Sequence, residues 1–471
     1  MSGSQPAAVP WEGFLQLMLS TEDPRGVLPE LLGVSPQTTS LKGVHVMNDV
    51  AQSVLGGCPV GAGDLLCCVI RHQHTGPSED NSDTALRFHE RYGEPYSRAY
   101  PANLGAGQTL RLRRAAELLL NADGGMYKPR TRMASGLGTH LQLLGQEGFR
   151  RFGVGHLVGA IIGAEGRDVV RGLFEDPRDP VARALRPLFQ GQEVVDTHPE
   201  VPRIPLSSFD RTLGRRLTAL LQQPLSKPVL LRLFVQATSL GLFLKVHGAG
   251  KPTGRPLVLG LSPAKRKKPA VLRQCSAATL RRGVEALDRE LGARVTAHPS
   301  LPELLRTRPT RGAPTLPVDH ARLVADPGVA LVGAARQQRT PKGVTSLTWP
   351  EEWVYALGRR TGFLPPGGGR AQYLRMTPEL VEALVLMFVA DGVTLAWEDL
   401  WRCIRQELGL IIGADTFLDR RALSDAGVPP ASAASLSSNN DEVLLAGCIR
   451  GVARHLPDSG AEAGGICGDL P

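Results

Sequence analysis

The chain has 471 residues, of which 42% are hydrophobic and 21% charged, and its formal net charge is +9. This composition excludes a disordered chain, and the length favours two to four domains over a single hydrophobic core. The longest apolar runs are far shorter than the roughly 18 residues of a membrane span.

The first part of the chain, residues 1–195, is expected to form a mixed α/β domain. Apolar residues between Trp11 and Leu19 recur at helical spacing, and Leu65–Ile70 has the length of a short buried strand. A helix is predicted over Thr109–Asn121, where the Asn-Ala-Asp-Gly-Gly sequence then stops it. Four prolines between residues 187 and 205 predict a linker at the end of this domain.

Two amphipathic helices are predicted in the middle domain, residues 205–300. Ser207 or Ser208 can cap a helix that runs to about Gln222, and Ser276 can open a second helix. Between them, residues 229–246 are apolar throughout, a pattern that fits strands or a buried helix. Five prolines in residues 298–318 mark a second break in the chain.

The third domain, residues 320–471, has the clearest signals. Thr377 and Pro378 provide a capping hydroxyl and a proline at the first helical position. A second helix is predicted over Leu395–Leu408 and a third after Asn440, followed by a hairpin of Val452–Leu456 and Ala461–Ile466. Helices followed by a hairpin are the order of a winged helix. We therefore expect an α+β, mostly helical, multi-domain fold with a winged-helix-like C-terminal domain.

Positive charge is concentrated in the centre of the chain. Residues 201–310 contain 20 Lys/Arg against 5 Asp/Glu, whereas residues 1–100 contain 6 against 11 and residues 376–471 contain 6 against 14. A basic centre between acidic ends predicts one surface that binds a polyanion and other surfaces that bind different partners.

The best candidates for phosphate contacts are consecutive cations within this basic centre. The sequence Ala264–Pro269 reads AKRKKP, a solvated run that can follow a phosphate backbone. The candidate nucleic-acid-binding residues are Lys265, Arg266, Lys267, Lys268, Arg281 and Arg282, with Arg211, Arg215 and Arg216 as a second group. The low aromatic content of 5% argues against many base-stacking contacts.

The acidic C-terminal domain does not have the charge of a DNA-binding winged helix. Its helix Leu395–Leu408 carries three acidic residues against two arginines, which opposes direct binding to a duplex. This domain is better suited to docking on partner protein subunits. Trp397 and Trp401 lie one turn apart and are interpreted as core residues.

The sequence predicts neither a metal site nor a cofactor site. The cluster of Cys58, Cys67, Cys68, His72 and His74 lacks the Cys-x2-Cys spacing of zinc sites. The glycine-rich residues 56–64 lack the Lys-Ser/Thr of a P-loop and precede an apolar run instead of a helix. We therefore expect neither a resident metal nor a cofactor.

Several catalytic motifs are also missing from the sequence. It contains no Glu-x-Lys, His-x-Lys, His-Glu-x-x-His or Gly-x-Ser-x-Gly, which lowers the expectation of an enzyme without excluding one. The leading hypothesis is a non-enzymatic adaptor that binds DNA or RNA within a larger machine. The alternatives are a scaffold that binds an acidic protein surface and an enzyme with an unrecognised site, for example a metal site.

The expected location is the cytoplasm. The first residues lack the basic and apolar regions of a signal peptide, and seven unevenly spaced cysteines do not form a disulfide framework. We therefore expect that the protein does not bind a membrane. The composition is rich in Ala, Gly, Pro and Arg and poor in Lys, as in proteins from GC-rich genomes such as those of many bacteria.

Overall fold

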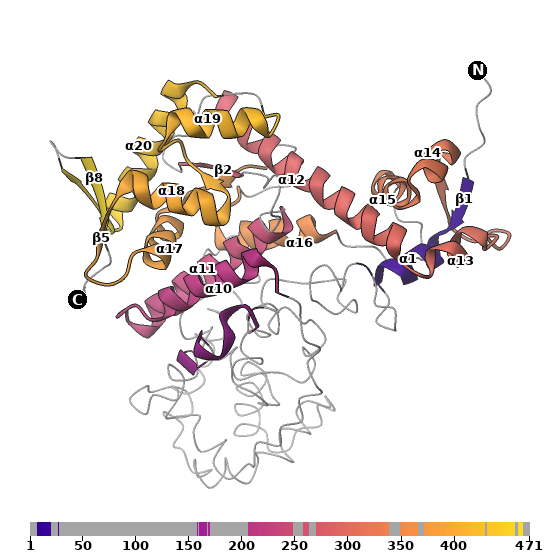
Figure 1. Cartoon of the computed structure of the whole chain (residues 1–471), viewed down its shortest axis with the longest axis horizontal. Helices are drawn as coiled ribbons and strands as arrows, with labels where there is room; N and C mark the ends of the chain where they lie inside the picture. The colour runs from indigo at the N-terminus through magenta and orange to yellow at the C-terminus, as the bar shows by residue number, and fades with distance from the viewer. Residues whose placement is uncertain are drawn as a thin grey trace, which may run out of the picture.

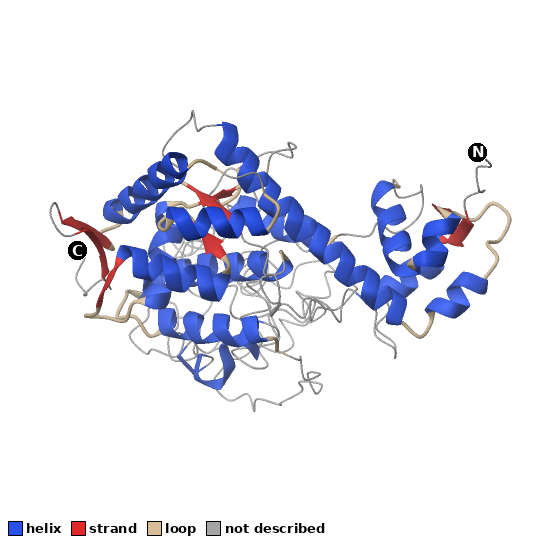
Figure 2. Ribbon diagram, turned by 45° about the horizontal axis from the view of Figure 1, so that its top comes forward, coloured by secondary structure: helices blue, strands red, loops and turns tan. Residues whose placement is uncertain are grey.

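The computed structural model in Figure 1 describes part of the chain, and within that part the fold is mostly helical with small sheets. The described residues are 7–19, 27, 158, 160–166, 168–169, 206–247, 258–262, 270–338, 349–365, 372–428, 431–456 and 460–464. Their elements form a larger and a smaller lobe, joined by the long helix α12 (Ala270–Ala297), as Figures 1 and 2 show. None of the described helices is both long and apolar enough to cross a membrane.

The smaller lobe surrounds the C-terminal half of α12. Its elements are β1 (Ala7–Pro10), α1 (Trp11–Leu19), α13 (Leu301–Arg306), β3 (Thr315–Val318), α14 (His320–Ala325) and α15 (Pro327–Gln337). Strands β1 and β3 pair antiparallel, with Ala7 opposite Val318 and Pro10 opposite Thr315. This pairing places the helix predicted at Trp11–Leu19 beside residues that follow the basic centre.

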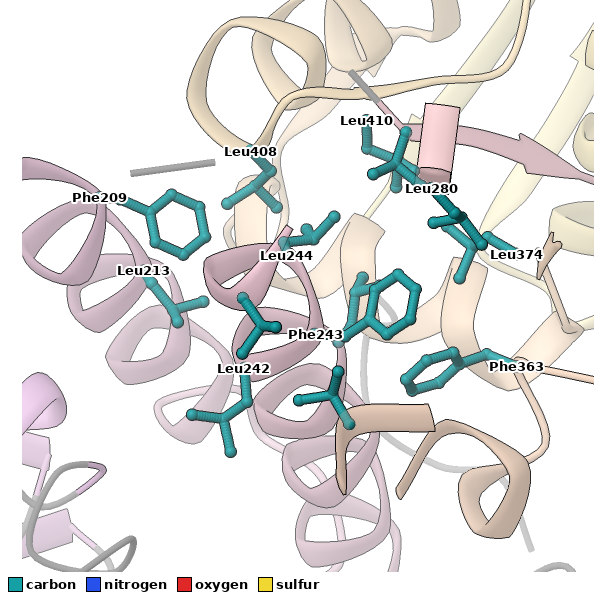
Figure 3. Close-up of a cluster of buried hydrophobic side chains, with 14 of the residues drawn as sticks. Phe209, Leu213, Leu242, Phe243, Leu244, Leu280, Phe363, Leu374, Leu408 and Leu410 are labelled. Atoms are coloured by element: carbon teal, nitrogen blue, oxygen red, sulfur yellow. The ribbon is translucent and has the colours of Figure 1, made fainter. Parts of the chain in front are cut away.

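The larger lobe has a helical core, which Figure 3 shows in part. It is built from α10 (Ser208–Leu221), α11 (Lys227–Val246), α16 (Pro350–Thr361) and α17 (Pro378–Phe388). Residues 229–246, for which the sequence left strand and helix open, are helical. Phe234, Phe243 and Leu244 are all buried, because helices pack on several sides of α11. A helix that is apolar all round is typical of such a position.

A small parallel sheet lies beside these helices. Strand β2 (Val258–Leu261) is central, with β4 (Leu374–Arg375) on one side and β6 (Leu410–Ile411) on the other. The helix predicted to open at Ser276 begins six residues earlier, at Ala270. Ser276 is buried inside α12, and its hydroxyl donates a hydrogen bond to the carbonyl of Leu259, 2.6 Å away. The Ser276 side chain therefore connects α12 to the sheet and does not cap the start of a helix.

The C-terminal elements confirm the helix starting after Thr377 and the hairpin. The order is α17, β5 (Thr394–Ala396), α18 (Trp397–Leu408), α19 (Thr416–Asp425), α20 (Ala433–Ile449), β7 (Ala453–Leu456) and β8 (Gly460–Gly464). Thr377 caps α17 by accepting a hydrogen bond from the backbone N–H of Leu380. Strand β8 pairs antiparallel with both β5 and β7, which gives the sheet order β5-β8-β7.

One predicted helix start in this region is wrong. Helix α20 begins after Ser432, whose hydroxyl accepts from the N–H of Ser435, and not at Asn440. Asn440 lies in the middle of α20, where its side-chain oxygen accepts a hydrogen bond from the Trp397 indole, 2.9 Å away. Trp397 and Trp401 are both buried, as the sequence predicted. The side-chain amide of Asn440 thus accepts the hydrogen bond of a buried indole N–H.

Candidate nucleic-acid interface

The lysine run, Lys265–Lys268, lies outside the described residues, but the structure describes both ends of its connection. Ser262 follows β2 and Ala270 begins α12. In the sequence, the run is therefore attached between the end of β2 and the start of α12. In open parallel sheets, ligands bind at the carboxyl ends of the strands.

Asn439 fixes the carboxyl end of β2. Its side-chain oxygen accepts from the N–H of Ser262 at 3.0 Å, and its amide donates to the carbonyls of Gly260 at 2.9 Å and Ile412 at 2.8 Å. Asn439 is buried, so these three hydrogen bonds join β2, β6 and α20 without competition from water. The attachment point of the lysine run is thus held rigidly.

Arg281 and Arg282 are both exposed on α12, the helix that follows the run. Their neighbours Leu280, Gly283 and Leu287 form the buried side of the helix, which leaves the two arginines on the outer side. Arg282 pairs with Glu285 at 3.0 Å and donates to the carbonyl of Gly427 at 3.4 Å. Arg281 has no ion pair or side-chain hydrogen bond with any described residue.

Arg211 and Arg215 are exposed on α10, and Arg211 donates to the backbone carbonyl of Leu206 at 3.2 Å. Arg216 differs, because its Nε donates to Glu407 Oε2 at 2.8 Å and a second hydrogen bond joins the same two side chains. Its guanidinium also lies 4.2 Å from the centre of the Phe388 ring. The hydrogen bonds that Arg216 donates to Glu407 raise the pKa of the Arg216 guanidinium further. Arg216 is therefore already neutralised inside the larger lobe.

Lys245, another cation of the basic centre, also forms an ion pair inside the protein. Its Nζ lies 2.8 Å from both carboxylate oxygens of Asp210, a fully buried residue. The Asp210 carboxylate also accepts from the backbone N–H of Ser207, and the Ser207 hydroxyl accepts from the backbone N–H of Asp210, which completes the capping box of α10. Part of the positive excess in residues 201–310 thus stabilises the fold.

The candidate cations that the structure describes lie on two different helices. The lysine run leads directly into α12, which carries Arg281 and Arg282, whereas Arg211 and Arg215 lie on α10. Within the described ranges, no hydrogen bond or ion pair links Arg211 and Arg215 on α10 (the α10 group) to Arg281 and Arg282 on α12 (the α12 group). The α12 group is therefore the better-defined candidate surface.

Sequence reasoning did not select three exposed arginines near the end of the basic centre. Arg306, Arg308 and Arg311 lie in and after α13, in a stretch that the sequence indicated only as a proline-rich break. Their Arg-x-Arg-x-x-Arg spacing was the signal available in the sequence.

The predicted absence of a metal site is not tested by the structure. Cys58, Cys67, Cys68, His72 and His74 all lie outside the described residues. Among the residues that are described, no group of three or more His, Cys, Asp and Glu side chains is arranged to hold a metal ion.

A buried polar cluster lies where α11, α12, α15 and α16 meet. His247 Nδ1 is 2.8 Å from the carbonyl oxygen of Phe243, and its Nε2 is 3.2 Å from the Tyr355 hydroxyl. A carbonyl can only accept, so Nδ1 carries the proton and Tyr355 donates to Nε2. Burial lowers the pKa of His247 to about 4, and it raises the pKa of Tyr355.

Arg336 connects the same region of the core. It donates to Asp288 and Glu351, and its guanidinium lies 4.0 Å from the centre of the Trp349 ring. Burial raises the pKa of Asp288 even though Arg336 opposes this. These groups bind one another inside the protein, so they belong to the core and not to a phosphate-binding surface.

Comparisons of the chain with protein-family models, with curated proteins and with solved structures gave no match.

Proposed function

We propose that this protein is a non-enzymatic adaptor that binds nucleic acid through its basic centre and binds partner protein subunits through its acidic ends. The observation that carries the proposal is the connection from β2 to α12. It contains four consecutive cations, starts at the carboxyl end of a parallel strand and leads into a helix with Arg281 exposed. Phosphate groups are the ligand class that such a row of cations neutralises best.

The exposure of Arg281 and Arg215 supports this proposal. Neither side chain forms an ion pair with a described residue, so contact with a phosphate breaks no ion pair within the described part of the chain. Arg282 is exposed and its bridge to Glu285 is a surface pair, which costs at most about 1 kcal/mol to exchange for a phosphate. Arg216 is left out of the proposed contact set because Glu407 already pairs with it.

For the acidic C-terminal region we propose a winged-helix-like unit that docks on protein. Strand β5, between the first two helices, pairs with the hairpin that follows α20, and this arrangement supports the winged-helix interpretation. Helix α20 would then be the recognition helix. It contains no Lys, Arg or His, and its exposed residues include Asp441, Leu445 and Ile449. Such a surface suits a protein partner better than a phosphate backbone.

Fluorescence anisotropy tests the nucleic-acid part of the proposal. Binding of labelled single- and double-stranded DNA and RNA is measured across a salt series for the native chain and for Lys265→Glu/Lys267→Glu/Arg281→Glu. We expect native binding with a steep salt dependence, and a variant slope that is lower by about 2 to 3.

A matched control carries the same change of charge at another place. Arg402→Glu/Arg421→Glu/Arg454→Glu reverses three exposed arginines of the C-terminal region and should leave the salt slope nearly unchanged. Absence of native binding at low salt, or an equal loss in both variants, would refute the proposal. The basic centre would then be better explained as a docking face for an acidic protein.

A further inference from the structure

The smaller lobe carries three further arginines that are not among the phosphate contacts proposed above. Arg306 ends α13, and Arg308 and Arg311 follow in the connection to β3; we call residues 306–314 the arginine loop. All three side chains are exposed, and none of them forms an ion pair or a hydrogen bond with a described residue. No Asp or Glu occurs between Leu304 and Val318. The loop therefore concentrates positive charge that is not neutralised locally.

The backbone of the arginine loop is fixed at several points. The Thr307 hydroxyl donates to the carbonyl of Glu303 at 2.9 Å, which ends α13. A turn follows, closed by the N–H of Ala313 and the carbonyl of Thr310 at 2.9 Å, with Gly312 at φ +83°. The N–H of Trp11 then donates to the carbonyl of Pro314 at 3.1 Å. A loop held in this way loses less conformational freedom when it binds a ligand.

The arginine loop is well separated from Arg281 and Arg282, the candidate phosphate contacts on α12. Arg282 lies fifteen residues before the end of α12 at Ala297, which corresponds to about 22 Å along the helix axis. Figures 1 and 2 show α12 crossing from the larger lobe to the smaller one, where α13 follows it. A ligand that contacts both surfaces must therefore be long, as a nucleic-acid strand or duplex is.

We propose that the arginine loop is a second phosphate-contact site for nucleic acid, formed by Arg306, Arg308 and Arg311. Guanidinium groups bind phosphate oxygens through two parallel hydrogen bonds, and three of them within six residues can follow successive phosphates. The inference rests on the proposed nucleic-acid function and adds the smaller lobe to its binding surface.

The test uses the full chain and a labelled 20-base-pair DNA duplex in a salt series. Arg306→Glu/Arg308→Glu/Arg311→Glu is compared with the native chain and with the control Arg402→Glu/Arg421→Glu/Arg454→Glu. We expect the arginine-loop variant to lower the salt slope by about 2 to 3 and to weaken binding at least tenfold at low salt. The conservative variant Arg306→Lys/Arg308→Lys/Arg311→Lys should keep most of the slope, because it keeps the charge.

The possible results separate this inference from the proposed function. If the native chain binds DNA and the arginine-loop variant behaves like the control, the second site is refuted while the proposed function stands. If the native chain binds neither DNA nor RNA, single- or double-stranded, in the salt series that tests the proposed function, both proposals are refuted. Thermal unfolding of each variant checks that the fold is intact, which we expect because the three substituted side chains are exposed.

Discussion

Arg216 and Glu407 join α10 to α18 across 191 positions of sequence, through two hydrogen bonds between a guanidinium and a carboxylate. Each side chain is about a quarter exposed, and Phe388 covers one face of the guanidinium. An arginine that the sequence placed in the second group of candidate phosphate contacts thus holds two helices together. Its positive charge has a structural partner that no local pattern reveals.

Replacing Arg216 should therefore affect stability more than binding. Arg216→Ala removes the ion pair with Glu407 in a partly buried position, at a cost of about 2 kcal/mol. Arg215→Ala, at the exposed neighbouring position, is the control and should change stability by no more than about 0.5 kcal/mol. Urea unfolding of both variants measures the difference. Equal stability of the two would show that the Glu407 pair contributes nothing.

The contact of α12 with α15 depends on glycine. A Cβ atom added to Gly328 would lie 1.9 Å from the carbonyl oxygen of Gly292 and 2.4 Å from the Thr296 hydroxyl. Gly328→Ala must therefore push the two helices apart, and we expect a loss of about 1 to 3 kcal/mol in the free energy of unfolding.

Gly333, on the same helix α15, provides the matched control for Gly328. Nothing lies within 4 Å of a Cβ atom placed there, so Gly333→Ala should gain about 0.5 to 1 kcal/mol from helix propensity. Thermal unfolding should shift in opposite directions for the two alanine variants. A shift in the same direction would contradict the close approach of Gly328 to Gly292.

The buried His247 predicts a stability loss in acid. Its pKa of about 4 in the folded protein lies below the ordinary value of 6.5, so the unfolded chain binds a proton more readily. The stabilisation is fully present above pH 6.5 and is lost as the pH falls to about 4. The total loss is about 3 kcal/mol, because one pKa unit corresponds to about 1.4 kcal/mol.

Urea unfolding between pH 7.5 and pH 4 tests the role of His247. His247→Gln should show a weaker dependence of stability on pH than the native chain over this range. His320→Gln replaces an exposed histidine and should keep the native pH dependence. An unchanged pH dependence in His247→Gln would mean that other groups cause the loss in acid.

Asn439 should be among the more sensitive polar residues of the larger lobe. Asn439→Ala would leave the N–H of Ser262 and the carbonyls of Gly260 and Ile412 without their side-chain partner. Each buried polar group without a partner costs about 1 to 3 kcal/mol, so we expect a total loss of at least about 3 kcal/mol. Ser438→Ala, at the exposed neighbouring position on α20, should be nearly neutral. Equal stabilities in chemical denaturation would show that water replaces the amide.

Features that depend on neighbouring residues could be predicted from the amino-acid sequence. Ser207 and Thr377 start helices because their oxygens reach N–H groups only three residues away. The hairpin β7–β8 was also predictable, since its strands are adjacent in the chain. The uneven charge is a property of composition and needs no fold.

Features that depend on distant residues could be seen only in the folded chain. Residues 229–246 are a helix because other helices cover their apolar surface. The spacing of apolar residues alone could not distinguish this helix from strands. Ser276 lies inside a helix because Leu259, on another element, offers its carbonyl. Arg216 and Arg281 look alike in sequence, yet Arg216 pairs with Glu407, whereas Arg281 forms no ion pair with any residue that the structure describes. The partner of a charged side chain is set by packing, because contacts between distant segments form only when the chain folds.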